Sequence, residues 1–408
     1  MTSTNRVYDP FPIAHQGLTP THELKWERIA ATLARQVLKL GRHERVIISA
    51  DPYFGGAALD AVRCEIQRAR AIELATILHW TPSLAALRAP HGRYADPADD
   101  AAELAAMRGL FAAADVFILL MNDRRGARTL ATSQSDLVVD GWKQGRSVHL
   151  HWFHDPAVRD PAHPVNLALD RVNQAAVIDV DYPRLSADMQ RIAARMSGAE
   201  VRIRDQAGTD LRFRVGTRFH VNHGDASREH AAGMESGRDR EEEIPAGSLR
   251  TIPEAGSTNG VLVFPPAKDG ESPALGRGMD CRPFAQAGLR FVFRDGRIIA
   301  VETNGDQAAL DRLWAAETGD CDQLGELVLG CNPLLTPVAG STFMPHYGFG
   351  AGVVRLILGD NQLSGGSYRS SFHRWLMWGD ASVEVGGATL VDRGRLQDPF
   401  KLWAQGHL

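Results

Sequence analysis

Apolar residues in the first half of the chain alternate between helical spacing and short uninterrupted runs. Helical spacing is found in residues 26–41, 55–69, 101–114 and 133–145, and the apolar runs cover residues 45–50, 72–80, 116–121 and 147–152. Gly41 is placed to end the first of these helices. Uninterrupted apolar strands between helices are typical of a parallel sheet covered on both faces. We therefore predict an α/β first domain over residues 1–182.

The pattern changes after about residue 182. A helix is predicted around residues 185–196, and hairpin-like pairs of strands follow in residues 199–215, 289–302 and 381–394. The second pair turns at Asp295-Gly296 and the third at Gly386-Gly387, both of which are strong hairpin signals. We therefore predict an α+β, mainly antiparallel second domain over residues 183–408, and a site cleft within it.

A long polar stretch, residues 220–247, reads as an irregular loop. It contains "HVNHGD" (220–225), whose two histidines and one aspartate fit no specific metal geometry, so we interpret it as a solvated loop. It also contains "DREEEIP" (239–245), which we interpret as a solvated charge run. A loop this long is usually either mobile or functional.

Composition and charge narrow the class of protein. The 408 residues carry a formal net charge of −4, which gives no electrostatic footprint for nucleic acid or for an acidic membrane face. The longest apolar runs are too short to cross a bilayer, and the first residues hold no segment of signal-peptide type. The four cysteines form no Cys-x-x-Cys pair, so we expect them to be reduced packing residues. A cytoplasmic protein is expected.

Five blocks of the second half, in order, carry a family resemblance. They are "GTDLRFRV", "EIPAGSLRTIPEAGSTNGVLVF", "LGELVLGCNP", "VVRLILGDN" and "SGGSYRSSFHRWLMWG". This order resembles the aminopeptidase T/S family of two-metal metallopeptidases and the related 2,5-dihydroxypyridine dioxygenases. The resemblance covers nearly the whole chain, and it implies the family's two-domain fold and a homodimer.

The resemblance also implies a set of metal ligands, and this chain keeps only part of it. Glu326 and His373 stand where the family pattern implies a glutamate and a histidine. Ser248 replaces an implied glutamate, Arg355 aligns with an implied histidine, and Trp375 stands where the aspartate of a His-x-Asp motif is implied.

These departures change the charge of the site. A two-metal centre holds two dications about 3.5–4 Å apart, and it needs bridging carboxylates to offset their repulsion. Two carboxylates are missing here, and Arg355 would add a permanent positive charge. We therefore predict a divergent aminopeptidase-like protein without a metal cofactor, which binds a peptide or a small amino-acid-like ligand in the old cleft. The predicted ligand-binding residues are Arg355 and Arg374 as anion anchors, with Ser248, Trp375 and Tyr347.

Two alternatives remain open. Glu326, His346 and His373 would form a two-histidine, one-carboxylate set for one divalent metal (Fe, Mn or Zn), in a small-amide hydrolase or a ring-opening non-haem iron dioxygenase. The chain could also be an active dinuclear aminopeptidase whose ligands align differently. Against the single-metal reading, His346 could be a loop residue and His373 a buried, hydrogen-bonded histidine. The sequence leaves open whether the chain is an enzyme.

Overall fold

The computed structural model of the chain forms two compact units, each described by itself. Unit 1 comprises Met1–Gln174 and Asp225–Ile244, and unit 2 comprises Ala175–Gly224 and Pro245–Leu408. Within them the structure describes residues 24–50, 56–78, 105, 108–122, 145–152, 154–155, 157–158, 160, 162–234, 238–264, 278–341 and 344–398. Nearly all of the helix predicted at 133–145 lies outside these residues, as do residues 101–104 and 106–107 of the one predicted at 101–114.

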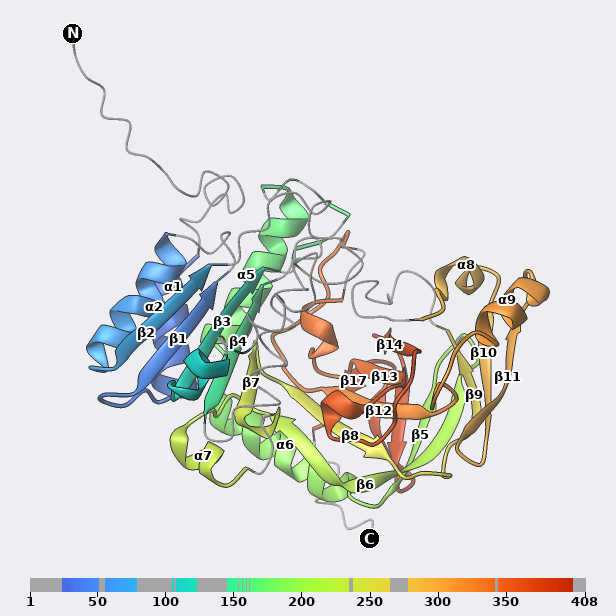
Figure 1. Cartoon of the computed structure of the whole chain (residues 1–408). Helices are drawn as coiled ribbons and strands as arrows, with labels where there is room; N and C mark the ends of the chain where they lie inside the picture. The colour runs from blue at the N-terminus through green and yellow to red at the C-terminus, as the bar shows by residue number, and fades with distance from the viewer. Residues whose placement is uncertain are drawn as a thin grey trace. The chain divides into compact units, whose positions relative to one another are not determined.

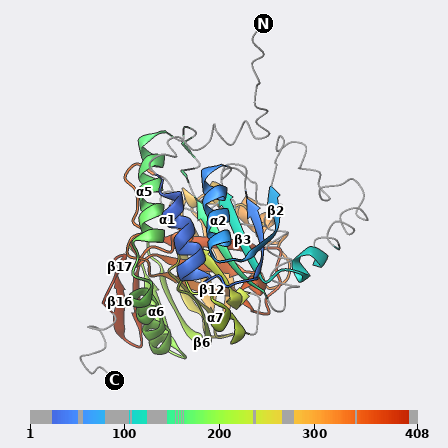
Figure 2. The same cartoon turned by 90° about the vertical axis from the view of Figure 1, so that its left-hand side faces the viewer.

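Unit 1 is built on a parallel sheet with the strand order β2-β1-β3-β4-β7. Its strands are β1 (Arg45–Ala50), β2 (Ile72–Leu78), β3 (Val116–Asn122), β4 (Arg146–Trp152) and β7 (Glu241–Ile244). The sequence predicted the first four within two residues at each end. The helical segments are α1 (Trp26–Ala31), the π-helix η2 (Thr32–Val37), α2 (Ala57–Arg68), α7 (Arg228–Ala232) and η4 (Arg238–Arg240). Helices α1 and α2 lie side by side over the strands (Figures 1 and 2).

Strand β7 corrects the interpretation of residues 239–245 as a solvated charge run. Glu241, Glu242 and Glu243 are 2%, 2% and 8% exposed, because β7 pairs in parallel with β4 at the edge of the sheet. His149 of β4 lies with its Nδ1 3.3 Å from Glu241 Oε1. The interpretation of "HVNHGD" as a loop was also wrong, since β6 extends to Asn222.

Unit 2 is built on a mainly antiparallel sheet, as predicted. Its order is β14-β13-β12-β8-β6-β5-β15-β16-β17, and β9, β10 and β11 join it through β6 (Figure 1). The strands are β5 (Glu200–Arg204), β6 (Asp210–Asn222), β8 (Ser248–Pro253), β9 (Asn259–Val263), β10 (Leu289–Arg294), β11 (Arg297–Thr303), β12 (Leu324–Gly330), β13 (Val354–Gly359), β14 (His373–Trp378), β15 (Ser382–Val385), β16 (Ala388–Asp392) and β17 (Arg395–Leu396).

The helices of unit 2 are few and the hairpins follow the sequence signals. The helices are α6 (Tyr182–Met196), α8 (Arg282–Ala285) and α9 (Gln307–Trp314), with the 3₁₀ turns η5 (His346–Gly348) and η6 (Gln362–Ser364); α5 (Pro164–Ile178) runs from unit 1 into unit 2. Asp295 and Gly296 both have positive φ, which is the conformation that a tight hairpin turn requires. The hairpin turns at 295–296 and 386–387 are therefore confirmed.

The boundaries between the two units differ from the single boundary that the sequence predicted. The sequence placed one boundary near residue 182, whereas the chain passes between the units after Gln174, Gly224 and Ile244. The reason is β7, which returns to the first sheet from a stretch that looked like a loop.

Two further findings concern the chain as a whole. No helix among the described residues is long and apolar enough to cross a membrane. All four cysteines are free, and Cys281 and Cys331 are buried, in accord with the expected packing role. A cytoplasmic location and a homodimer stay predictions.

Candidate ligand-binding site

Strand pairing in unit 2 brings four of the predicted site residues to one face of the sheet. Glu326 of β12 lies opposite Ile357 of β13, which lies opposite Trp375 of β14. Directly opposite residues share a face, and so do residues two apart on one strand. Arg355 and His373 therefore face the same side as Glu326 and Trp375. The four come from three adjacent antiparallel strands (Figure 1).

Two residues of β8 join this face by the same pairing. Arg250 lies opposite Val328 and Ser248 lies opposite Gly330, both on β12. Both side chains are buried, and Arg250 Nε lies 3.4 Å from Ser248 Oγ. Ser248 therefore lies on the same face as Glu326. Arg250 was not predicted, although its spacing of two from Ser248 in a strand would have indicated it.

His373 is held by two hydrogen bonds that fix its protonation pattern. Its Nδ1 lies 2.8 Å from the carbonyl oxygen of Asp360, and the Trp375 indole Nε1 donates to its Nε2 at 2.7 Å. An indole N–H can only donate and a carbonyl can only accept. His373 therefore carries its proton on Nδ1 and uses the Nε2 lone pair to accept from Trp375. In this arrangement neither ring nitrogen has a lone pair left for a metal ion.

Arg355 is a fully buried cation among aromatic rings. Its Cζ lies 3.8 Å from the centroid of the Trp375 ring and 5.7 Å from that of Phe349, and its Nη1 donates to the carbonyl oxygen of Tyr347 at 3.1 Å. A guanidinium over an indole face is attracted by the ring quadrupole, by about 2 kcal/mol when desolvated. Arg250 also contacts the Phe349 ring, with its Cζ 5.4 Å from the ring centroid. Two guanidinium groups thus border one phenyl ring.

The turn that carries Tyr347 is strained. His346, Tyr347 and Gly348 have φ values of 42°, 53° and 77°, and two of the three are not glycine. Left-handed backbone at a non-glycine residue is uncommon and is found often at functional sites. The turn places the Tyr347 ring 5.6 Å from the Trp375 ring in an edge-on arrangement. Tyr347 therefore contacts this group of residues through both its carbonyl oxygen and its ring.

The carboxylate of Glu326 is buried, and only one of its two oxygens accepts a hydrogen bond within the described part of the chain. Its side chain is 1% exposed, and Ser364 Oγ donates to its Oε2 at 2.5 Å. Its Oε1 accepts no hydrogen bond from the residues that the structure describes. Such an atom carries a desolvation cost of about 1–3 kcal/mol unless a ligand or water satisfies it. Glu326 does not pair with Arg355. Glu326 accepts a hydrogen bond from Ser364, and Arg355 donates one to the carbonyl oxygen of Tyr347.

The other two predicted residues lie differently. Arg374 faces the opposite side of the sheet from His373 and Trp375, because side chains alternate along a strand. There it donates to the carbonyl oxygens of Gly278 and Met279 at 2.6–2.9 Å. The structure therefore does not bring Arg374 to this face as an anion anchor. His346 is fully buried, with its ring edge-on to Phe349 at 4.8 Å between centroids.

The residues do not fit a pair of metal ions as they stand. Of the family's implied ligands only Glu326 offers a donor atom without a hydrogen bond among the described residues. The nitrogen that His373 would offer is occupied by Trp375, and a guanidinium lies on the same face. Glu326 alone is too few ligands for a pair of ions, which needs several bridging carboxylates.

The arrangement of a parallel-sheet unit and an antiparallel-sheet unit is that of the aminopeptidase T-like fold, which confirms the predicted fold class. Among solved structures the chain is similar to wild-type AmpT (aminopeptidase T) from Thermus thermophilus, with a TM-score of 0.60 and 16% identity over 91% of this chain and 98% of that chain. It is also similar to 2,5-dihydroxypyridine dioxygenase from Pseudomonas putida KT2440, with a TM-score of 0.59 and 16% identity over 91% and 96%. The sequence matches no protein-family model and no curated protein sequence.

Proposed function

We propose that this chain is a divergent aminopeptidase-like protein that binds a peptide or an amino-acid-like ligand and does not perform two-metal peptidase chemistry. The observation that carries the proposal is the hydrogen bond from Trp375 Nε1 to His373 Nε2. The residue in the aspartate position supplies no metal ligand, and it also occupies the nitrogen of the histidine that remains.

The charge of Arg355 supports the same proposal. Two unit charges about 4 Å apart interact by several kcal/mol at an effective dielectric constant near 20, and a dication doubles that repulsion. Arg355 is buried on the face where the metal pair would lie, and a guanidinium does not deprotonate in proteins. A bound metal pair would therefore have to displace Arg355 as well as break the bond between Trp375 and His373.

The remaining groups suit a ligand that carries both charges of an amino acid. Glu326 Oε1 is a buried carboxylate oxygen that can accept from an ammonium group. Arg355 lies on the neighbouring strand, two positions from the residue opposite Glu326, and its planar fork of donors suits a carboxylate or a peptide carbonyl. The two groups thus offer opposite charges one strand apart.

The first test is peptidase activity. We expect no release of N-terminal residues from simple peptides in the presence of added zinc, cobalt or manganese, because the site lacks the carboxylates that hold a metal pair. Chromatography of the peptide products measures the release. Metal-dependent turnover by the wild-type chain that vanishes in a Glu326→Ala variant would show that the two-metal alternative is right. The same variant is the control for a contaminating peptidase, whose activity would persist in it.

The second test is the variant His373→Gln. We expect the free energy of unfolding to fall by about 1–2 kcal/mol, because two buried hydrogen bonds are disturbed, with little effect on ligand affinity. Chemical denaturation and elemental analysis measure stability and metal content, and His163→Gln, at an exposed histidine, is the matched control. If the wild-type chain retains about one metal ion and the His373 variant loses it, the single-metal reading with Glu326 and His346 replaces ours.

A further inference from the structure

A cavity lined by charged side chains lies in unit 1, and none of its lining residues belongs to the ligand-binding face of unit 2. One cavity of about 580 Å³ lies between η2 and α2 and is lined by Ala34, Arg35, Lys39, Leu40, Glu65, Arg68 and Ala69. Three of these side chains are cationic and one is a carboxylate, so the lining carries an excess of positive charge.

The buried carboxylate of Glu65 orients two of the three cations. Arg35 donates to it through Nε at 2.6 Å and Nη2 at 2.9 Å, and Arg68 donates through Nη1 at 2.5 Å. The Arg35 hydrogen bond, opposed by burial and assisted by Arg68, lowers the pKa of Glu65, so the carboxylate stays ionised and keeps both guanidinium groups in place. Arg35 Nη1 and Arg68 Nε and Nη2 make no hydrogen bond with the residues that the structure describes. These donors are pre-oriented and available to a ligand.

The backbone beside the cavity contains a π-helix and a left-handed residue. Residues 32–37 form a π-helix, and Leu38 N donates to Leu33 O at 2.9 Å across the wider turn. π-Helical turns are rare and are found frequently at functional sites. Lys39, just beyond, has a left-handed φ of 48°, which is a strained conformation for a non-glycine residue. The Nζ of Lys39 donates to Asp225 Oδ2 at 2.8 Å, and this ion pair keeps the lysine near the cavity.

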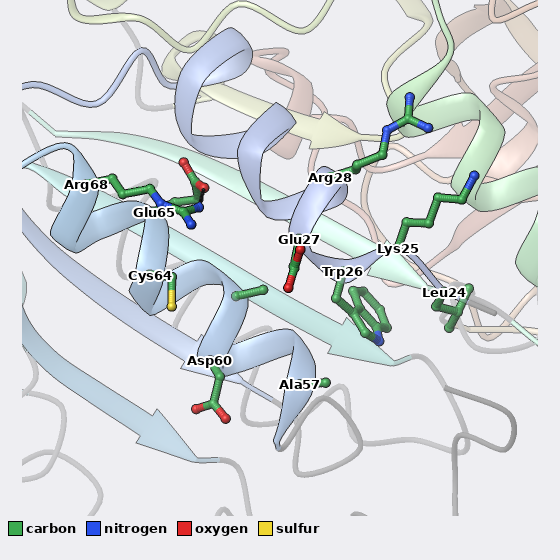
Figure 3. A pocket seen from close by; sticks show the side chains of 11 residues that line it. Leu24, Lys25, Trp26, Glu27, Arg28, Ala57, Asp60, Cys64, Glu65 and Arg68 are labelled. Atoms are coloured by element: carbon green, nitrogen blue, oxygen red, sulfur yellow. Dashed lines mark hydrogen bonds and ion pairs between the residues drawn. The ribbon is translucent and has the colours of Figure 1, made fainter. Parts of the chain in front are cut away.

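A second cavity continues from the first. It measures about 600 Å³ and shares Glu65 and Arg68 with the first, then extends past Cys64 to Trp26 (Figure 3). The two cavities together are larger than an inorganic anion. An organic body attached to the anion could therefore lie along α2.

We infer that the cavity between η2 and α2 binds a phosphoryl group, through Arg35, Arg68 and Lys39. Guanidinium forks match the geometry of phosphate oxygens, and a lysine adds a point charge. The source is inorganic phosphate or a phosphate monoester whose body lies in the second cavity. The site uses none of the residues of the ligand-binding face in unit 2, so it stands or falls independently of the proposed function.

The experiment is calorimetric titration of the full chain with inorganic phosphate and with phenyl phosphate, against chloride at matched ionic strength. We expect saturable binding of phosphate by the wild-type chain and a loss of affinity of about tenfold or more in Arg68→Gln and in Lys39→Met, since each removes a charge-assisted contact. Arg63→Gln is the matched control, because Arg63 lies on the same helix, carries the same charge and pairs with Glu73 outside the cavity.

Alkylation of Cys64 by iodoacetamide distinguishes the two sources, because this cysteine is exposed and lines the second cavity. Protection by phenyl phosphate, together with tighter binding than inorganic phosphate, identifies a phosphate monoester. Equal affinities without protection identify free phosphate. No saturable binding of either probe, or an equal loss of affinity in the Arg63→Gln control, overturns the inference.

Discussion

Replacing Trp375 by alanine is expected to lower the free energy of unfolding of unit 2 by about 3 kcal/mol, the lower end of the usual cost of truncating a large aromatic side chain, because the indole is only partly buried. The indole contacts the Arg355 guanidinium and the Tyr347 ring, and it supplies the donor for His373. The variant loses all three interactions and leaves a buried cation without its aromatic face. Hydrogen exchange in peptides that cover β13 and β14 measures the effect within unit 2.

The variant Trp375→Phe separates the ring from its N–H group. It keeps an aromatic face for Arg355 and removes only the donor to His373 Nε2, so we expect a smaller cost of about 1–2 kcal/mol. Equal losses in the two variants would mean that packing of the ring contributes nothing beyond the hydrogen bond. A loss below about 1 kcal/mol in Trp375→Ala would contradict the arrangement of the site itself.

The second large effect is expected for Arg355→Ala. We expect ligand binding to weaken by about 1.5–3 kcal/mol, the typical contribution of a hydrogen bond to a charged group. The guanidinium is fully buried, and Tyr347 engages it through one nitrogen, Nη1. Calorimetric titration with a panel of free amino acids and dipeptides, compared between wild type and variant, measures the loss.

Arg355→Lys is the matched variant for this test. It keeps the charge but lacks the planar fork and the delocalised face that rests on the indole, so only part of the affinity should return. Equal affinities in wild type, Arg355→Ala and Arg355→Lys would show that the ligand does not contact this residue. Arg374→Lys is a useful control, since Arg374 lies on the opposite face of the same sheet.

The sequence predicted the apolar strands and the hairpins of this protein, but it did not predict the polar edge strand β7. Apolar runs and Asp-Gly or Gly-Gly turns identify β1, β3 and the hairpins, because burial of a whole strand and positive φ in a turn both leave a local signal. Strand β7 leaves none, since "EEEI" is polar by composition and becomes buried only through a partner strand far away in the sequence.

The sequence predicts which face of the sheet several candidate residues share, but it predicts few of the hydrogen bonds that they make. Aligned blocks and strand alternation place Glu326, Arg355 and Trp375 on one face, and the same alternation places Arg374 on the other. The identity of each partner depends on three-dimensional placement. Nothing in the sequence indicates that Ser364, on a turn after β13, donates to Glu326. The i, i+2 spacing of His373 and Trp375 did contain the signal for their bond.

The return of β7 to the first sheet has a consequence for biosynthesis. The amino-terminal unit cannot complete its sheet until Ile244 has emerged from the ribosome, by which time α6, β5 and β6 of the other unit have already been made. Completion of the first sheet therefore has to wait until part of the other unit has been synthesised, unlike the usual order for chains of consecutive domains. A fragment cut at residue 174 or 182 would leave the edge of β4, with the buried His149, uncovered. The nascent chain must protect that edge while the next strands are synthesised.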